Sequence, residues 1–219
     1  MGNLMIAEKI PAHAKIKGAE GKGNNLSSEA FETPKLRVIA TANSGEITQG
    51  WPDAKVGMWS NTLSKEIYDE VYVVPINLVE SYQAYNNTEN NAFWNGATSE
   101  FVSKEEAMRE VEAAGAKPDE HSTRPFHTHN VLQLDPKTGE IITAARIEFK
   151  NTAVGMISKT WNTLIAQKGG DRFSSVWKLG SEKIEKSKSK IWHQATVEYV
   201  GFCTDAIYKE AEKFYDAVS

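Results

Sequence analysis

The sequence is poor in cysteine and contains no long apolar run. Its single cysteine, Cys203, excludes an internal disulfide framework and any metal site of the C-x-x-C type. No apolar stretch approaches the roughly 20 residues that span a bilayer, and the N-terminal segment lacks the apolar region of a signal peptide. These absences predict a protein of the cytoplasm with no membrane partner.

The short motifs of common enzyme classes are also missing. The chain has no Walker A loop, no GxGxxG, no GxSxG and no HExxH. We therefore expect no enzymatic activity and no cofactor. One alternative stays open, because His127 and His129 share a face of an expected strand and could bind zinc together with Glu120 or His121.

Charge is distributed unevenly along the chain. The formal net charge is only -4. Residues 41–120 nevertheless carry 14 acidic and 5 basic groups, a net charge of -9, whereas residues 150–193 carry 9 basic and 3 acidic groups, a net charge of +6. Sequence-level charge is informative about partners. The basic block is the part of this acidic protein that can meet a polyanion.

The hydrophobic patterning predicts a mainly β, antiparallel fold with helical decoration. Turn residues and alternation indicate strands within 35–42, 54–62 and 66–85, a hairpin over 127–151, a strand around 173–179 followed by a basic loop, and a strand over 191–201. Helices are expected over 104–114, 158–169 and 205–218. Pro75 marks an edge position or a bulge. A partly open, OB-like barrel fits this order best, and an α+β sandwich comes next.

The expected domain organisation is simple. Residues 1–33 are rich in glycine, asparagine and serine and are interpreted as a flexible N-terminal arm. Residues 34–219 form a single domain. An acidic helical insertion occupies about 86–120, where Ser103 and Glu106 form a capping box and Gly115 ends the helix.

Aromatic and basic residues are interleaved within residues 159–192. Sequence-independent binding of single strands needs cations that follow the phosphates and aromatic faces on which bases stack. Lys186, Lys188 and Lys190 alternate and would share one strand face with Trp192. The candidate nucleic-acid contacts are Lys159, Trp161, Lys168, Arg172, Lys178, Lys186, Lys188, Lys190 and Trp192. The alternative is that Trp161, Trp177 and Trp192 are core residues and the lysines form a solvated loop.

The order of these segments resembles the single-stranded-DNA-binding, OB-fold-like proteins of tailed bacteriophages. The resemblance runs from Pro34 to Val218 and lies in PKLRVI…NSGEITQG, AKVGMWSNTLSKEIYDEVYVVPI, THNVLQLDPKTGEIITAARIEFKNTAVGMISKTWNTLIAQK and KSKIWHQATVEYVGFCTDAIYKEAEKFYDAV. It implies sequence-independent binding of single-stranded DNA in phage replication or recombination, in the host cytoplasm. Lys159 and Trp161 match one motif, and Lys188, Lys190 and Trp192 match another.

Two features depart from that family. The chain ends in KEAEKFYDAVS, an expected helix, where many such proteins have a disordered acidic tail that recruits replication partners. The acidic insertion has no clear counterpart and could be an internal partner surface. The rival hypothesis is a phage structural or host-modulating factor that binds a basic protein through this acidic face and binds no nucleic acid. Replication proteins and a homo-oligomer remain open as further partners.

Overall fold

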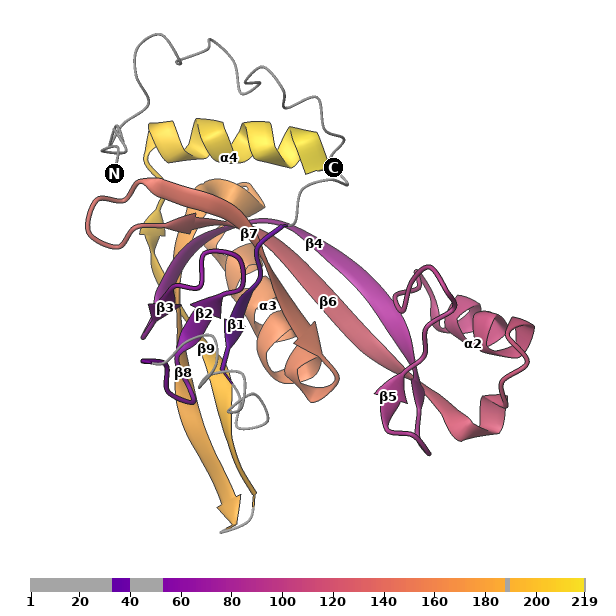
Figure 1. Ribbon diagram of the computed structural model, residues 1–219. Coiled ribbons are helices and arrows are strands. Elements are labelled where there is room, and N and C mark those ends of the chain that lie inside the picture. Colours follow the sequence, from indigo (N-terminus) through magenta and orange to yellow (C-terminus); the bar gives the residue numbers. More distant parts are fainter. Residues whose placement is uncertain (1–32, 40–52, 188–189, 219) are drawn as a thin grey trace, which may run out of the picture. The chain divides into compact units, whose positions relative to one another are not determined.

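The computed structural model describes residues 33–39, 53–187 and 190–218, and long antiparallel strands dominate this part of the chain (Figure 1). The central sheet has the strand order β7-β6-β4-β8-β9, and a short β5 pairs with the end of β4. A separate three-stranded sheet has the order β1-β2-β3. The strands are β1 (Leu36–Val38), β2 (Trp59–Asn61), β3 (Ile67–Tyr68), β4 (Val71–Asn86), β5 (Asn91–Ala92), β6 (His121–Leu134), β7 (Ile141–Lys150), β8 (Ser175–Ser187) and β9 (Lys190–Phe202).

Local turn chemistry explains the β6–β7 hairpin. The Asp135 carboxylate accepts hydrogen bonds from the backbone N–H groups of Lys137 and Thr138, at 2.7 and 3.1 Å. Gly139 supplies a positive φ of 71° that closes the turn. The expected hairpin over 127–151 is confirmed.

Pro75 lies at an irregularity in the longest strand. The β4–β6 register shifts between Pro75 and Asn77, which confirms the expected bulge. β8 pairs with β4 only over Val71–Val73, so the other side of β4 has no strand partner at Pro75 among the described residues. The missing N–H of proline is therefore tolerated inside the sheet.

The described residues also contain three α-helices and three short helical turns. They are α2 (Lys104–Ala113), α3 (Lys159–Lys168) and α4 (Asp205–Val218), with η4 (Pro118–Glu120), the π-helical turn η5 (Val154–Ser158) and η6 (Arg172–Ser174). The Ser103 hydroxyl accepts from the Glu106 N–H at 3.0 Å, as the capping box predicts. The Glu106 carboxylate reaches the N–H of Val102, one residue before the position expected.

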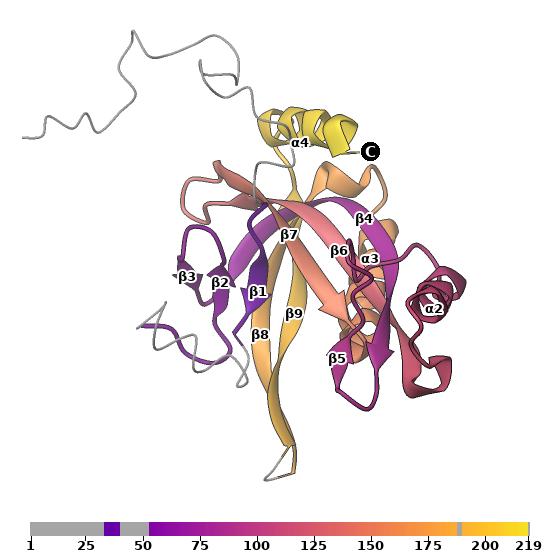
Figure 2. The same ribbon diagram turned by 45° about the vertical axis from the view of Figure 1, so that its right-hand side comes forward.

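The two faces of the central sheet carry separate apolar clusters. One cluster packs Trp161 and Ile165 of α3 against Trp177, Val131 and Trp59, together with β1 and β2. The other cluster lies beneath α4. Figures 1 and 2 show α4 and α3 on opposite faces of the sheet. α3 therefore packs on the sheet through one face, which carries Trp161 and Ile165, and leaves its other residues largely exposed.

The acidic insertion lies at the far end of the β4–β6 pair (Figure 2). It has its own small apolar cluster, in which Ala107 and Val111 of α2 pack on Ala84 and Phe101. α2 thus lies between β5 and β6 in chain order and packs through its own small cluster.

The mainly antiparallel β architecture is confirmed, and the sheets of the described residues are open. The basic loop expected after residue 179 is wrong, because β8 continues to Ser187 and pairs with β9 down to Ser187–Lys190. The single strand expected to carry Lys186, Lys190 and Trp192 is wrong for the same reason, since Lys186 lies on β8, whereas Lys190 and Trp192 lie two residues apart on β9. The expected N-terminal arm lies outside the described residues, apart from residue 33. No helix in the described part of the chain is long and apolar enough to cross a membrane.

Candidate nucleic-acid interface

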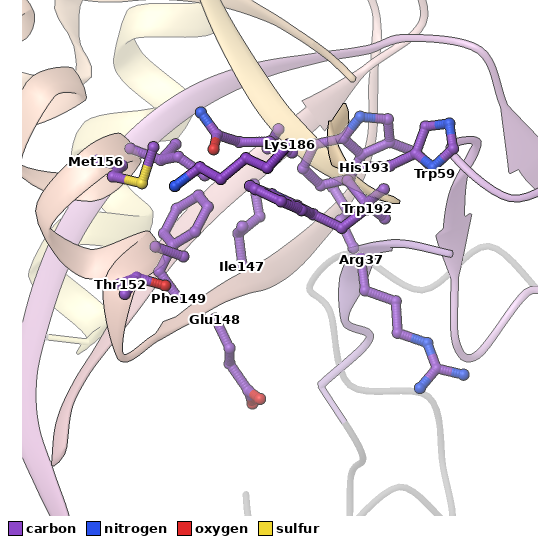
Figure 3. Close-up of a pocket in the computed structure, with 16 residues that line it drawn as sticks. Arg37, Trp59, Ile147, Glu148, Phe149, Thr152, Met156, Lys186, Trp192 and His193 are labelled. Carbon is purple, nitrogen blue, oxygen red and sulfur yellow. The ribbon is translucent and has the colours of Figure 1, made fainter. Parts of the chain in front are cut away.

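A cavity of about 460 Å³ opens where β1, β7 and β9 approach the π-helical turn η5. Its apolar lining includes Ile147, Phe149 and Met156, and its polar lining includes Arg37 and Lys186. Figure 3 shows the Lys186 side chain running alongside the Trp192 ring, with the apolar residues around the same hollow. We call this hollow the Trp192 pocket.

Trp192 and Lys186 form a cation–aromatic pair at this pocket. The Lys186 Nζ lies 5.6 Å from the centre of the Trp192 ring, within the range of a cation–π contact. Trp192 is half-buried and Lys186 is exposed. The pair therefore combines an accessible aromatic surface with a positive charge, which are the two components of a stacking site for an unpaired base.

Further cations surround the pocket. Lys35 and Arg146 both pair with one Glu148 oxygen, at 2.8 and 3.2 Å, so two positive charges offset a single carboxylate. Arg37 of β1 also lines the pocket, and in Figure 3 its side chain extends away from the Lys186–Trp192 pair. Among the described charged residues at the pocket, basic groups therefore outnumber the single Glu148 carboxylate, a balance that favours an anion such as phosphate.

A second cation–aromatic pair lies farther along β9. The Lys168 Nζ at the end of α3 is 4.1 Å from the ring centre of Tyr199. Seven residues separate Tyr199 from Trp192, which corresponds to about 23 Å of strand. We call the stretch of β9 from Trp192 to Tyr199, which has Met156 of η5 near one end and Lys168 of α3 near the other, the β9 seam.

Three of the residues expected to contact nucleic acid are engaged by other groups of the protein. Trp161 is fully buried, stacks on His129 at 4.7 Å and cannot receive a base in this conformation. Arg172 donates to His129 and to Asn162, and burial lowers the pKa of its guanidinium to about 10. Lys178 pairs with Glu198 at 2.6 Å and with Glu70 at 3.5 Å, so its charge is already offset.

The remaining expected residues differ in position. Lys159 is exposed at the start of α3. Lys188 lies outside the described residues, and the side chain of Lys190 is likewise not described. The structure thus brings together Lys186 and Trp192, and adds Lys168 at the far end of the seam.

The three histidines considered for a zinc site do not lie together, because His121 is separated from His127 and His129. His127 and His129 do share a face of β6, but both contact the buried hydroxyl of Ser158, at 2.8 and 2.6 Å. His121 lies at the other end of β6, where its Nδ1 is 2.8 Å from the Lys117 carbonyl. Among the described residues no three side chains of the metal-ligating types lie close enough to hold an ion.

Arg37, Met156 and His193 line the pocket but were not among the expected contacts. The only available signal was the alternation in KLRV (35–38), which separates Lys35 and Arg37 from the buried Leu36. Met156 and His193 carry no local signal, because their position depends on how η5 and β9 approach each other.

Comparison with known proteins gives a match to one family. A family model described as Pam3 phage gp34-like protein matches residues 3–219. No curated protein and no solved structure shows a significant match.

Proposed function

Because the chain belongs to the Pam3 phage gp34-like protein family, and is thus a phage protein, we propose that it binds single-stranded DNA without sequence preference. The binding would protect single strands during phage replication or recombination. The observation that carries the proposal is the Lys186–Trp192 pair at the mouth of the Trp192 pocket.

The proposed chemistry is non-covalent. An unpaired base would stack on the exposed part of Trp192, with a contribution of about 1–3 kcal/mol per stacked base. Lys186 would hold the adjacent phosphate, and Lys168 would contact the DNA strand farther along β9. Such contacts read the backbone and the face that every base has, so they carry no sequence preference. This binding mode resembles that of OB-fold proteins, but it requires only the open β9 seam and not a closed barrel.

Anisotropy of a dye-labelled oligo-dT tests the proposal. We expect saturable binding at low salt that weakens linearly on a double-logarithmic salt plot, as counterion release requires. Equal affinity for duplex of the same length would contradict it, because a paired base cannot enter the pocket. Absence of binding at low salt would also refute it.

A protein-interaction role is the second candidate, favoured by the surface of the acidic insertion. Trp94 and Val102 are 60% and 79% exposed there, close to the carboxylates of α2. Exposed aromatic residues in a charged rim are frequent at protein interfaces. This role predicts a basic protein partner and no oligo-dT binding.

A further inference from the structure

The wall of the Trp192 pocket is connected to a buried network of hydrogen bonds between side chains. Met156 and Ile157 of η5 line the pocket, and the next residue is Ser158. The Ser158 hydroxyl lies 2.8 Å from the Nδ1 of His127 and 2.6 Å from the Nε2 of His129. A π-helical turn is uncommon and is frequent at functional sites. Two strand residues therefore fix the end of the turn that forms the wall.

The direction of each hydrogen bond follows from Arg172. Its Nη2 can only donate, so the Nδ1 of His129 accepts at 2.9 Å and the proton of His129 is on Nε2. That N–H donates to Ser158, which leaves the Ser158 O–H to donate to the Nδ1 of His127. The remaining Nε2–H of His127 faces the Glu80 carboxylate at 3.5 Å. In this network every donor has an acceptor only while both imidazoles are neutral.

Protonation of either histidine disrupts this pattern of hydrogen-bond donors and acceptors. A proton on Nδ1 of His127 would turn it into a donor, and Ser158 would then face two donors with no acceptor for its own hydrogen. A second proton on His129 would face the Arg172 guanidinium directly. The charged groups that act on the two histidines are Arg172 on η6, Lys159 on α3 and Glu80 on β4. Only Glu80, 66% exposed, favours the charged form.

We propose that His127, Ser158 and His129 are positioning residues that hold Met156 and Ile157 in the pocket wall, and that acid releases this hold and weakens ligand binding at the Trp192 pocket. The inference rests on the proposed function for its ligand. Burial lowers the pKa of both histidines below the ordinary value, which is consistent with a hold that persists at neutral pH and fails below it.

Oligo-dT affinity as a function of pH tests the proposal. From about pH 7.5 to 5 we expect the wild-type affinity to fall about fivefold or more, the lower end of usual coupling between sites. His127→Gln keeps an acceptor for the Ser158 hydroxyl and cannot titrate, so its affinity should stay level. His121→Gln, on the same strand but bonded to Lys117, is the matched control and should follow the wild type.

The outcomes separate clearly. Added positive charge alone would make binding to DNA stronger in acid, so a level or rising wild-type affinity would overturn the proposal. A parallel decline in His127→Gln would also overturn it. Glu80→Gln, a change at a largely exposed side chain, should move the midpoint of the decline to lower pH, because Glu80 favours the protonated form of His127.

A second measurement works without DNA. In a Trp51→Phe/Trp94→Phe background, acrylamide quenching reports mainly on Trp192, since Trp59, Trp161 and Trp177 are buried. Quenching should rise in acid in the wild-type pocket and remain constant with His127→Gln. If oligo-dT fails to bind at any pH while quenching behaves in this way, the proposed function fails and the positioning role stands. Constant quenching in both proteins would refute the positioning role.

Discussion

The ammonium group of Lys186 lies 5.6 Å from the ring centre of Trp192, across the two strands of the β8–β9 hairpin. This contact stabilises the lysine over an aromatic surface at the edge of a pocket. It is the one place in the described residues where a residue pair expected from the sequence to bind nucleic acid is found together and accessible.

Removal of the Lys186 charge should reduce the salt dependence of binding. For single strands each phosphate contact contributes about 0.7 to the slope of the double-logarithmic salt plot. Lys186→Ala should therefore lower the slope by about 0.7, and a Lys188→Ala/Lys190→Ala double variant by about 1.4. Lys213→Ala on α4 changes the net charge equally and removes a lysine paired with Glu210, so its slope should match the wild type.

Lys178→Ala should leave oligo-dT affinity within about twofold of the wild type, below the energy of one useful contact. The reason is that Glu198 and Glu70 already offset this charge. An isothermal titration at low salt measures the difference. A loss as large as that of Lys186→Ala would show that Lys178 leaves its partners to bind DNA.

Gly57 packs closely against His193, a residue of the Trp192 pocket. A Cβ at this position would lie 2.5 Å from the Cδ2 of His193, a residue that lines the pocket. Gly57→Ala should destabilise the protein by about 1–3 kcal/mol through overpacking and weaken oligo-dT binding. Gly96→Ala has the same φ of 97° and no neighbour within 4 Å, so it isolates the backbone cost. Equal urea midpoints for the two variants would contradict the packing explanation.

The buried histidine should make stability depend on pH. Burial lowers the pKa of His129 well below the ordinary value of 6.5, and the charge of Arg172 acts in the same direction. Below about pH 6.5 this histidine therefore binds a proton in the unfolded protein but not in the folded protein, until the pH reaches the lowered pKa. The free energy of unfolding should therefore be level above about pH 6.5 and fall by up to about 1.4 kcal/mol per pH unit below it. Urea unfolding at several pH values measures this slope, and a slope of zero between about pH 6.5 and 5 would refute it.

Local signals in the sequence predicted much of the fold. The β6–β7 hairpin follows from Asp135 and Gly139, and α2 follows from the cap at Ser103 and the stop at Gly115. Each of these signals acts between residues close in sequence. Trp161 could not be placed in this way, because its neighbours Trp177 and His129 come from distant strands.

The same limit applies to the candidate site. KSKSK contains none of the glycine, asparagine or proline residues that mark a tight turn, so the sequence predicted one continuous strand face where the structure has a hairpin. The contact between Lys186 and Trp192 depends on that hairpin. Ser158 lies about 30 residues from the two histidines it joins, and no spacing rule connects them.

The most direct measurement compares oligo-dT affinity of Trp192→Ala with that of Trp94→Ala by anisotropy at low salt. Both variants remove one tryptophan that is at least partly accessible, but only Trp192 lies at the pocket. We predict that Trp192→Ala weakens binding by about 1–3 kcal/mol, that Trp192→Phe restores most of this loss, and that Trp94→Ala binds as the wild type does. Equal affinities for Trp192→Ala and Trp94→Ala, or no binding by the wild type, would contradict the account.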